Sequence, residues 1–306
     1  MKRRNTAYNF FLTSRPYSYA GEIARSIVFT LLLAPASLPN TLIYTVIITL
    51  LMWLYFNWQS DWIQKDPGRI TPSVYLCFGP LLVAFILSYI EGHLLGILGV
   101  LIYSCTILLY PLKARYKKIG VIGPLLRAIT ILGHFVMISA CLHQFPTNTS
   151  ILIVVVIASF KGIRNLIGDI RDIKTDKWEL PARFGITKTT NILRLSFLFT
   201  IVLSLMIHER NIFLLTIFLA GSSWIVFEML ILILEKSQAY MVGYLCHRYM
   251  ILSISTYLII LAIFLGLQKI DVVLLSMILI ISQLFYNSIP GKNYPNFKES
   301  VKKMFH

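Results

Sequence analysis

Carboxylates are scarce in this sequence, which has 13 Asp and Glu residues among 306 but 28 Lys and Arg. Cysteine is rare as well. The four cysteines are scattered without a Cys-x-x-Cys pair, so we expect small packing residues rather than a metal site. A glycine-rich phosphate loop of the Walker type and a Gly-x-Ser-x-Gly elbow are both missing. Nucleotide hydrolysis and acyl transfer by those devices are therefore not supported.

Extended polar stretches are also few, because 57% of the residues are hydrophobic and the mean hydropathy is +0.74. Apolar runs of about 17 to 25 residues, enough to cross a bilayer, recur along the chain. This pattern predicts an all-α, polytopic membrane helix bundle of nine or ten transmembrane helices, formed by residues 1–306 as one domain. The candidate spans are 21–38, 40–57, 73–91, 94–112, 122–142, 149–166, 190–207, 211–233, 247–267 and 271–288.

The distribution of Lys and Arg predicts the orientation of these spans. With the N-terminus inside, nearly all basic residues fall in inner loops or flanks, whereas Arg210 and Lys269 lie outside and Arg127 lies within a span. Because basic loops favour the cytoplasm, residues 1–20 and 289–306 are expected to be a cytoplasmic arm and tail. The net charge of +15 then reflects topology and attraction to anionic lipid, and no nucleic acid partner is expected.

The few carboxylates concentrate in one segment, 165–185, which follows an apolar run. It contains Asp169, Asp172, Asp176 and Glu179. The three aspartates are spaced by three and four residues, which places them on one face of a helix. Like charges on one stripe repel, so a cation is expected among them, and divalent cations with oxygen ligands are the usual solution.

A second stretch, residues 55–72, repeats this pattern about half a chain earlier. Asn57 and Asp61 have the spacing of Asn165 and Asp169, and Asp66 precedes a Pro-Gly pair that ends any helix. Such an internal echo is typical of two halves of a bundle that face a shared site. The two clusters could hold two Mg²⁺ ions and leave positions for substrate phosphate oxygens.

The segment 168–185, GDIRDIKTDKWELPARFG, resembles the second aspartate motif of the UbiA superfamily of intramembrane prenyltransferases, including its Leu-Pro-x-Arg-x-Gly tail. The family's first motif is Asn-x3-Asp-x3-Asp, from which this chain departs. In one register Lys65 occupies the third position and Asp66 comes one residue late. In the other, Asp61 is the last aspartate and Asn57 replaces the middle one. Both registers remain open.

The resemblance implies Mg²⁺-dependent transfer of a prenyl group from an isoprenoid diphosphate to a hydrophobic acceptor, an aromatic or quinone precursor, from a cytoplasmic cavity. The expected metal ligands are Asn57, Asp61, Asp66, Asp169, Asp172 and Asp176. The expected catalytic residues are Asp61, Asp172, Asp176 and Lys113, of which Lys113 belongs to a Tyr-x-x-Lys that resembles the family's. The expected diphosphate- or prenyl-binding residues are Asn57, Arg69, Asn165, Arg171, Lys174, Tyr110, Trp58 and Trp62.

Other ionisable residues fall within the predicted spans. Glu22 and Arg25 are one turn apart and are expected to pair. Arg127 and His134 are seven residues apart and lie on nearly the same helical face. Each is expected either to contact substrate or to have a structural role, in which Arg127 extends to the inner membrane surface and His134 packs in the bundle. Glu228 either pairs with a basic residue or orients an acceptor.

Three alternative functions can be compared with this pattern. A terpene cyclase similar to this family would capture the allylic cation within one substrate. A transporter would also have many spans and pseudo-repeats, but its ionisable groups should lie near the middle of the membrane. A scaffold protein would have no need for metal-type ligands repeated in two halves.

Overall fold

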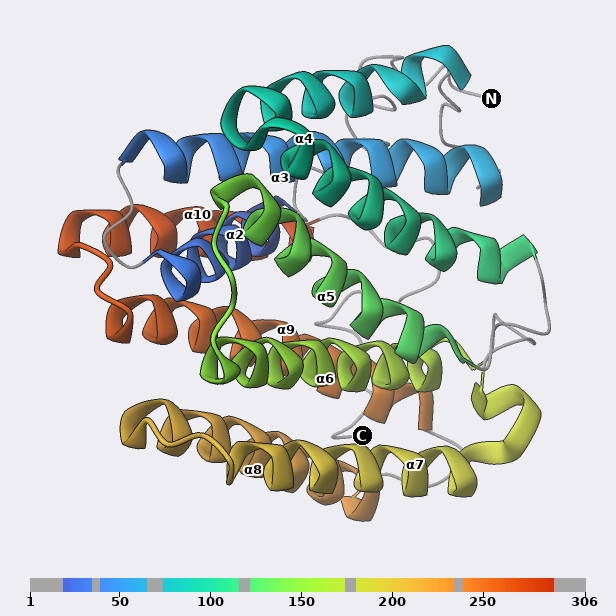
Figure 1. Cartoon of the computed structure of the whole chain (residues 1–306). Helices are drawn as coiled ribbons and strands as arrows, with labels where there is room; N and C mark the ends of the chain where they lie inside the picture. Colours follow the sequence, from blue (N-terminus) through green and yellow to red (C-terminus); the bar gives the residue numbers. More distant parts are fainter. Residues whose placement is uncertain are drawn as a thin grey trace.

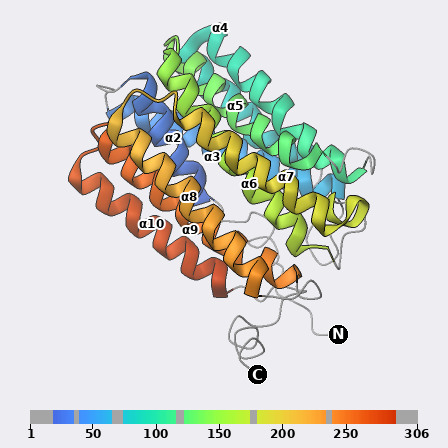
Figure 2. The same ribbon diagram turned by 90° about the horizontal axis from the view of Figure 1, so that it is seen from below.

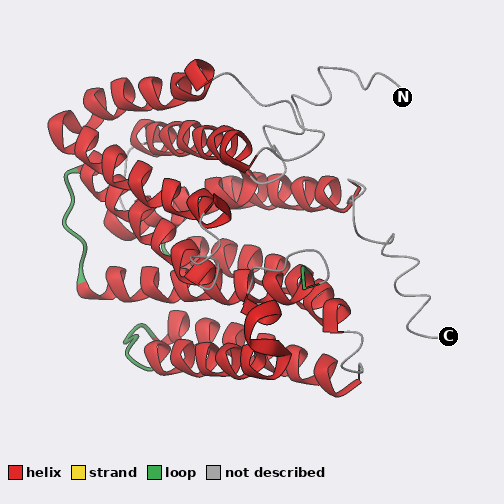
Figure 3. Ribbon diagram, turned by 90° about the vertical axis from the view of Figure 1, so that its right-hand side faces the viewer, coloured by secondary structure: helices red, strands yellow, loops and turns green. Residues whose placement is uncertain are grey.

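The computed structural model describes residues 19–34, 39–64, 74–115, 122–173, 180–233 and 239–288, and within these ranges the regular structure is entirely helical (Figure 3). Seven of the helices are long and apolar enough to cross a membrane. The elements are α2 (Tyr19–Leu33), α3 (Pro39–Gln64), α4 (Val74–Arg115), α5 (Gly123–Leu142), α6 (Asn148–Arg171), α7 (Leu180–Ser204), α8 (Arg210–Ile233), α9 (Ala239–Phe264) and α10 (Lys269–Ser288).

These helices lie on the predicted apolar runs, and their breaks have local causes. α4 covers two predicted spans because it turns over at His93, whose φ of 48° is outside the helical range. α5 ends at His143, which adopts the left-handed conformation with φ 52°. α6 begins with Thr147 as its cap, and the Thr147 side chain accepts a hydrogen bond of 3.1 Å from the Ser150 backbone N–H.

α2 is short, yet it contacts helices from both the early and the late parts of the chain. It packs against α3, α5, α6, α9 and α10. Its side chains Ala24, Ser26, Val28, Phe29 and Thr30 are all fully buried. Figure 1 and Figure 2 both show α2 enclosed by these neighbours, while α7 and α8 form a hairpin at one edge of the bundle.

The acidic segments predicted to converge follow the C-terminal ends of α3 and α6. Figure 1 shows these two ends on the same side of the bundle, the right-hand side of the view. Their convergence on one side is the arrangement that a shared site between the two motifs requires.

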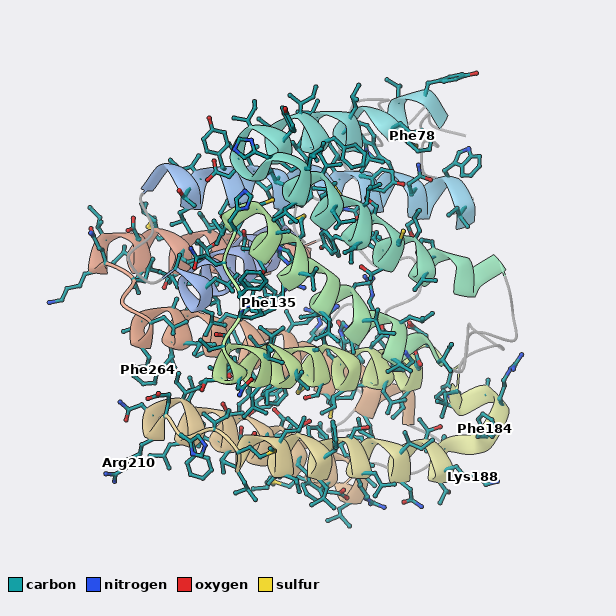
Figure 4. All side chains as sticks on the ribbon, viewed as in Figure 1. Phe78, Phe135, Phe184, Lys188, Arg210 and Phe264 are labelled. Carbon is teal, nitrogen blue, oxygen red and sulfur yellow. The ribbon has the colours of Figure 1, made fainter. Side chains whose placement is uncertain are left out.

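The described outer surface of the bundle is rich in apolar side chains, as expected for helices that face lipid. Phe78, Phe184 and Phe264 are exposed at the periphery in Figure 4, whereas Phe135 lies inside and is 5% exposed. Exposed large apolar side chains are frequent on α4, α7, α8 and α10. The described surface therefore agrees with a membrane environment.

Glu228 pairs with a basic residue, which confirms one of its two expected roles. Its carboxylate accepts hydrogen bonds from Arg194 Nε at 2.7 Å and Nη2 at 2.8 Å, and from Trp224 Nε1 at 2.9 Å. Since Arg194 belongs to α7 and Glu228 to α8, this cluster fastens the hairpin.

Glu228→Gln is expected to destabilise the hairpin by about 1 kcal/mol, because it removes the charge from a partly exposed, two-pronged pair. The measurement is thermal unfolding in detergent, with Glu209→Gln in the exposed α7–α8 loop as the matched control. Equal unfolding temperatures for the two variants would show that the pair does not fasten the hairpin.

Candidate active site

One face of α6 carries nearly all the polar side chains of its second half. At 100° per residue these positions fall within an arc of about 160°. The opposite face is apolar and buried, with Ile163, Leu166, Ile167 and Ile170 each at most 2% exposed. α6 therefore turns a continuous polar stripe toward the neighbours on its other side. The stripe consists of Lys161, Arg164, Asn165, Gly168, Asp169, Arg171 and Asp172.

The stripe ends in an ion pair between adjacent residues. Arg171 donates to Asp172 from Nε at 2.9 Å and from Nη2 at 2.7 Å. Asp172 caps α6, and its backbone N–H donates to Gly168 O at 3.0 Å. Arg171 Nη1 also lies 3.4 Å from His247 Nδ1 on α9, where the guanidinium can only donate. The Asp172 carboxylate is thus held in place by a guanidinium that α9 supports.

Two glycines allow α9 and α6 to approach closely at this point. A Cβ on Gly243 would lie 2.3 Å from Arg171 N and 2.7 Å from Arg171 Cα. A Cβ on Gly168 would lie 3.5 Å from the His247 ring. The absence of a side chain at Gly243 therefore sets the distance between α9 and the acidic end of α6.

Basic side chains gather along the stripe. His247 has Arg171, Arg164, Lys161 and Arg248 as electrostatic neighbours. Lys161 in turn has Arg164, Arg25, Arg127 and Glu22. So many cations in a medium of low dielectric are costly unless an anion compensates them. The arrangement suits a ligand with several negative charges.

Aromatic rings accompany these cations. The Arg127 guanidinium lies 4.8 Å from the centroid of Phe56 and 5.9 Å from that of Trp53 on α3. The Arg248 guanidinium lies 4.8 Å from the Tyr244 ring. Arg127 is thus directed to α3 and its aromatic residues.

The structure describes the first motif in part. Asn57 is fully buried on α3, Trp58 is partly buried and Trp62 is 40% exposed. Asp61 belongs to the last turn of α3, and Tyr110 and Lys113 to the last turns of α4, but their side chains are outside the described part. Asp66, Arg69, Lys174 and Asp176 lie outside the described residues.

The described oxygen ligands fit Mg²⁺ by their chemistry. The Asp169 carboxylate is 5% exposed, and Asn57 has a buried amide oxygen. Both are hard oxygen donors of the kind that Mg²⁺ prefers. Within the described ranges, no three His, Cys, Asp or Glu side chains form a metal-sized group.

Sequence reasoning missed several members of this site. It counted Lys161, Arg164 and Arg248 with the inner flanks, although the structure places them beside buried groups of the bundle. A usable signal was present, because Lys161 and Arg164 share a helical face with Asn165, Asp169 and Asp172. His247 carried no such signal, since its role depends on the approach of α9 to α6.

No protein-family model and no curated protein matches the sequence. Solved structures do match the fold. A UbiA homologue from Archaeoglobus fulgidus bound to Cd²⁺ aligns with a TM-score of 0.59 at 13% identity, over 80% of this chain and 99% of that one. A digeranylgeranylglyceryl phosphate synthase aligns with a TM-score of 0.59 at 15% identity, over 84% and 99%.

A structure of the Archaeoglobus fulgidus UbiA homologue bound to GPP and Mg²⁺ aligns over 90% of this chain and 97% of that one, with a TM-score of 0.53 and 13% identity. These alignments each cover nearly the whole of the matched protein. The structural likeness confirms the fold that the aspartate motif indicated: this chain has the UbiA fold.

Proposed function

We propose that the protein uses Mg²⁺ to transfer a prenyl group from an isoprenoid diphosphate to an acceptor within the membrane. The observation that carries this proposal is the α6 stripe, where Lys161, Arg164 and Arg171 share a helix face with the Asp169 carboxylate and with Asn165, a proposed substrate-binding residue. A magnesium diphosphate needs both cationic side chains and hard oxygen ligands. The UbiA fold supports the proposal, since a neighbour with this fold is bound to GPP and Mg²⁺ and another structure to DMAPP and Mg²⁺.

The metal would be held by carboxylates and an amide from both motifs. The bound Mg²⁺ supplies positive charge that neutralises the departing diphosphate. The proposed metal ligands are Asn57, Asp61, Asp66, Asp169, Asp172 and Asp176. The basic side chains that hold the diphosphate oxygens directly are Arg69, Lys113, Lys161, Arg164, Arg171 and Lys174.

The chain's own residues then favour the breaking of the allylic C–O bond. The bond's electron pair leaves with the diphosphate, whose growing charge the basic side chains stabilise. The prenyl group becomes cationic, and the π-faces of Trp58 and Trp62 shield it from water. The apolar interior of the bundle accommodates the isoprenoid tail. The acceptor attacks the cation and releases a proton.

The acceptor we propose is an aromatic or quinone precursor, and the cavity opens to the cytoplasm. The orientation follows from the basic inner loops. The acceptor class follows from the resemblance to aromatic prenyltransferases of the UbiA superfamily. Direct identification would come from mass spectrometry of lipids and quinones in cells with and without the gene.

The proposal predicts release of diphosphate from a prenyl donor in the presence of Mg²⁺. Purified protein incubated with radiolabelled dimethylallyl, geranyl, farnesyl and geranylgeranyl diphosphates should turn over at least one of them. EDTA should abolish the release, because the departing diphosphate loses its counter-charge. Release from no chain length would contradict the proposal and favour transport, whereas a cyclic hydrocarbon product without acceptor would indicate a cyclase.

A further inference from the structure

A second group of polar side chains is buried where α2 meets α3 and α5. α2 contributes Glu22, Arg25 and Ser26, α3 contributes Thr49 and α5 contributes His134, and none of them is more than 5% exposed. These five residues, called here the α2 cluster, do not belong to the metal or diphosphate residues proposed above. Ionisable groups at membrane depth are costly and are functional by default.

The hydrogen bonds of Thr49 fix the tautomer of His134. Thr49 Oγ1 lies 2.7 Å from Thr45 O and 3.1 Å from Ser26 Oγ. A carbonyl oxygen can only accept, so the single Thr49 proton belongs to the shorter contact with Thr45 O, and the Ser26 hydroxyl donates to Thr49. Toward His134 Nε2, at 2.9 Å, Thr49 can therefore only accept. It follows that Nε2 carries the ring proton and that Nδ1 carries a lone pair.

Two hydrogen-bond acceptors in the α2 cluster have no partner among the described residues. They are His134 Nδ1 and Glu22 Oε2, both buried. The other Glu22 oxygen pairs with Arg25. Glu22 and His134 are electrostatic neighbours within the α2 cluster. A buried acceptor that lacks a donor costs free energy, which makes the site complementary to a ligand that donates.

The walls of this site are aromatic. The His134 ring stacks on Tyr103 with centroids 5.1 Å apart and planes at 15°, and it meets Phe29 edge-on at 5.2 Å. Tyr103 and Phe29 are themselves at most 1% exposed. A small hydrophobic or aromatic molecule with one polar group matches such surroundings.

The α2 cluster adjoins the α6 stripe. Lys161 is an electrostatic neighbour of both Glu22 and Arg164, so it stands between the two groups. Resting on the proposed function, we propose that the α2 cluster binds the hydroxyl group of the prenyl acceptor, a phenol or alcohol, which donates its one hydroxyl proton to His134 Nδ1. An ionised carboxylate has no proton to donate to the Nδ1 lone pair, so the site favours a hydroxyl over an acid group at this position.

The test compares 4-fluorophenol, which has a hydroxyl group to donate, with 4-fluoroanisole, in which a methyl group replaces the hydroxyl hydrogen. Binding to the full-length protein in lipid nanodiscs is followed by ¹⁹F NMR, with empty nanodiscs to subtract partition into lipid. His134→Phe keeps the stacked ring and removes Nδ1. We expect it to weaken 4-fluorophenol binding at least about tenfold and to leave 4-fluoroanisole unchanged. His208→Phe, in the exposed α7–α8 loop, is the matched control.

Thr49→Val is a second test, because it removes the oxygen that accepts from His134 Nε2 and so no longer keeps the ring proton on that nitrogen. It is expected to weaken 4-fluorophenol binding several-fold. Equal affinity for both probes, or no effect of either variant, would overturn the proposal and leave a buried water as the occupant. Calorimetry with geranyl diphosphate and Mg²⁺ in the same samples tests the proposed prenyl transfer separately from the hydroxyl site. Wild-type protein that binds 4-fluorophenol through His134 but ignores geranyl diphosphate would refute the proposed function and retain the hydroxyl site.

Discussion

Asp172→Ala is expected to lower the rate of prenyl transfer about a thousandfold or more, by analogy with the removal of other groups that stabilise transition-state charge. In the structure Asp172 caps α6 and holds Arg171 through two hydrogen bonds. Its loss removes a proposed metal ligand and also frees the guanidinium that is directed to the same region. Both effects weaken stabilisation of the departing diphosphate. The measurement is kcat with a radiolabelled prenyl diphosphate at saturating Mg²⁺.

Asp271→Ala is the matched control, because Asp271 lies in the first turn of α10, away from the α6 stripe. It should keep wild-type activity. Asp176→Ala should behave like Asp172→Ala if the second motif acts as one unit. Normal turnover in both variants, with intact helical content, would remove the second motif from the mechanism.

Gly243→Ala is expected to lower activity about a hundredfold, although residue 243 has no functional group of its own. The added Cβ would lie 2.3 Å from Arg171 N, a distance that real Cβ atoms do not tolerate. Overpacking of this kind costs about 1 to 3 kcal/mol and forces α9 away from α6. Because a displacement of about 1 Å near reacting groups can cost a hundredfold in rate, the shift of Arg171 should reduce kcat.

Gly221→Ala on α8 is the matched control, because nothing lies within 4 Å of a Cβ at that position. It should leave both activity and thermal unfolding unchanged. The Gly243→Ala protein should also unfold at a lower temperature, which separates a packing effect from a local catalytic one. Unchanged kcat and stability would show that α9 can move without disturbing the stripe.

The helices were predictable because bilayer-length apolar runs leave little choice of secondary structure. The turn at His93 falls between the predicted spans 73–91 and 94–112, and the pairing of Glu22 with Arg25 is confirmed. The likeness to UbiA structures confirms the family resemblance at the level of the fold. In each case the signal is local in sequence, either a run, a break or a spacing of one turn.

The rest of the candidate site depends on contacts between distant helices, which periodicity cannot supply. Periodicity assigns Lys161 to a face of α6 but does not reveal that Glu22 on α2 lies beside it. Likewise, the sequence does not distinguish Gly243 from other helix glycines, because its close approach to the Arg171 backbone is visible only in the structure. The partner of Glu228 is 34 residues away at Arg194 and was not named by any motif.

The central claim is that the α6 stripe binds a magnesium prenyl diphosphate. The most direct measurement is an experimental structure with Mg²⁺ and a non-hydrolysable geranyl diphosphate analogue. The account predicts diphosphate density beside Lys161, Arg164 and Arg171, with Mg²⁺ on oxygens of Asp169 and of the α3 motif. Diphosphate density at another surface, with this stripe in contact only with protein side chains or lipid, would contradict it.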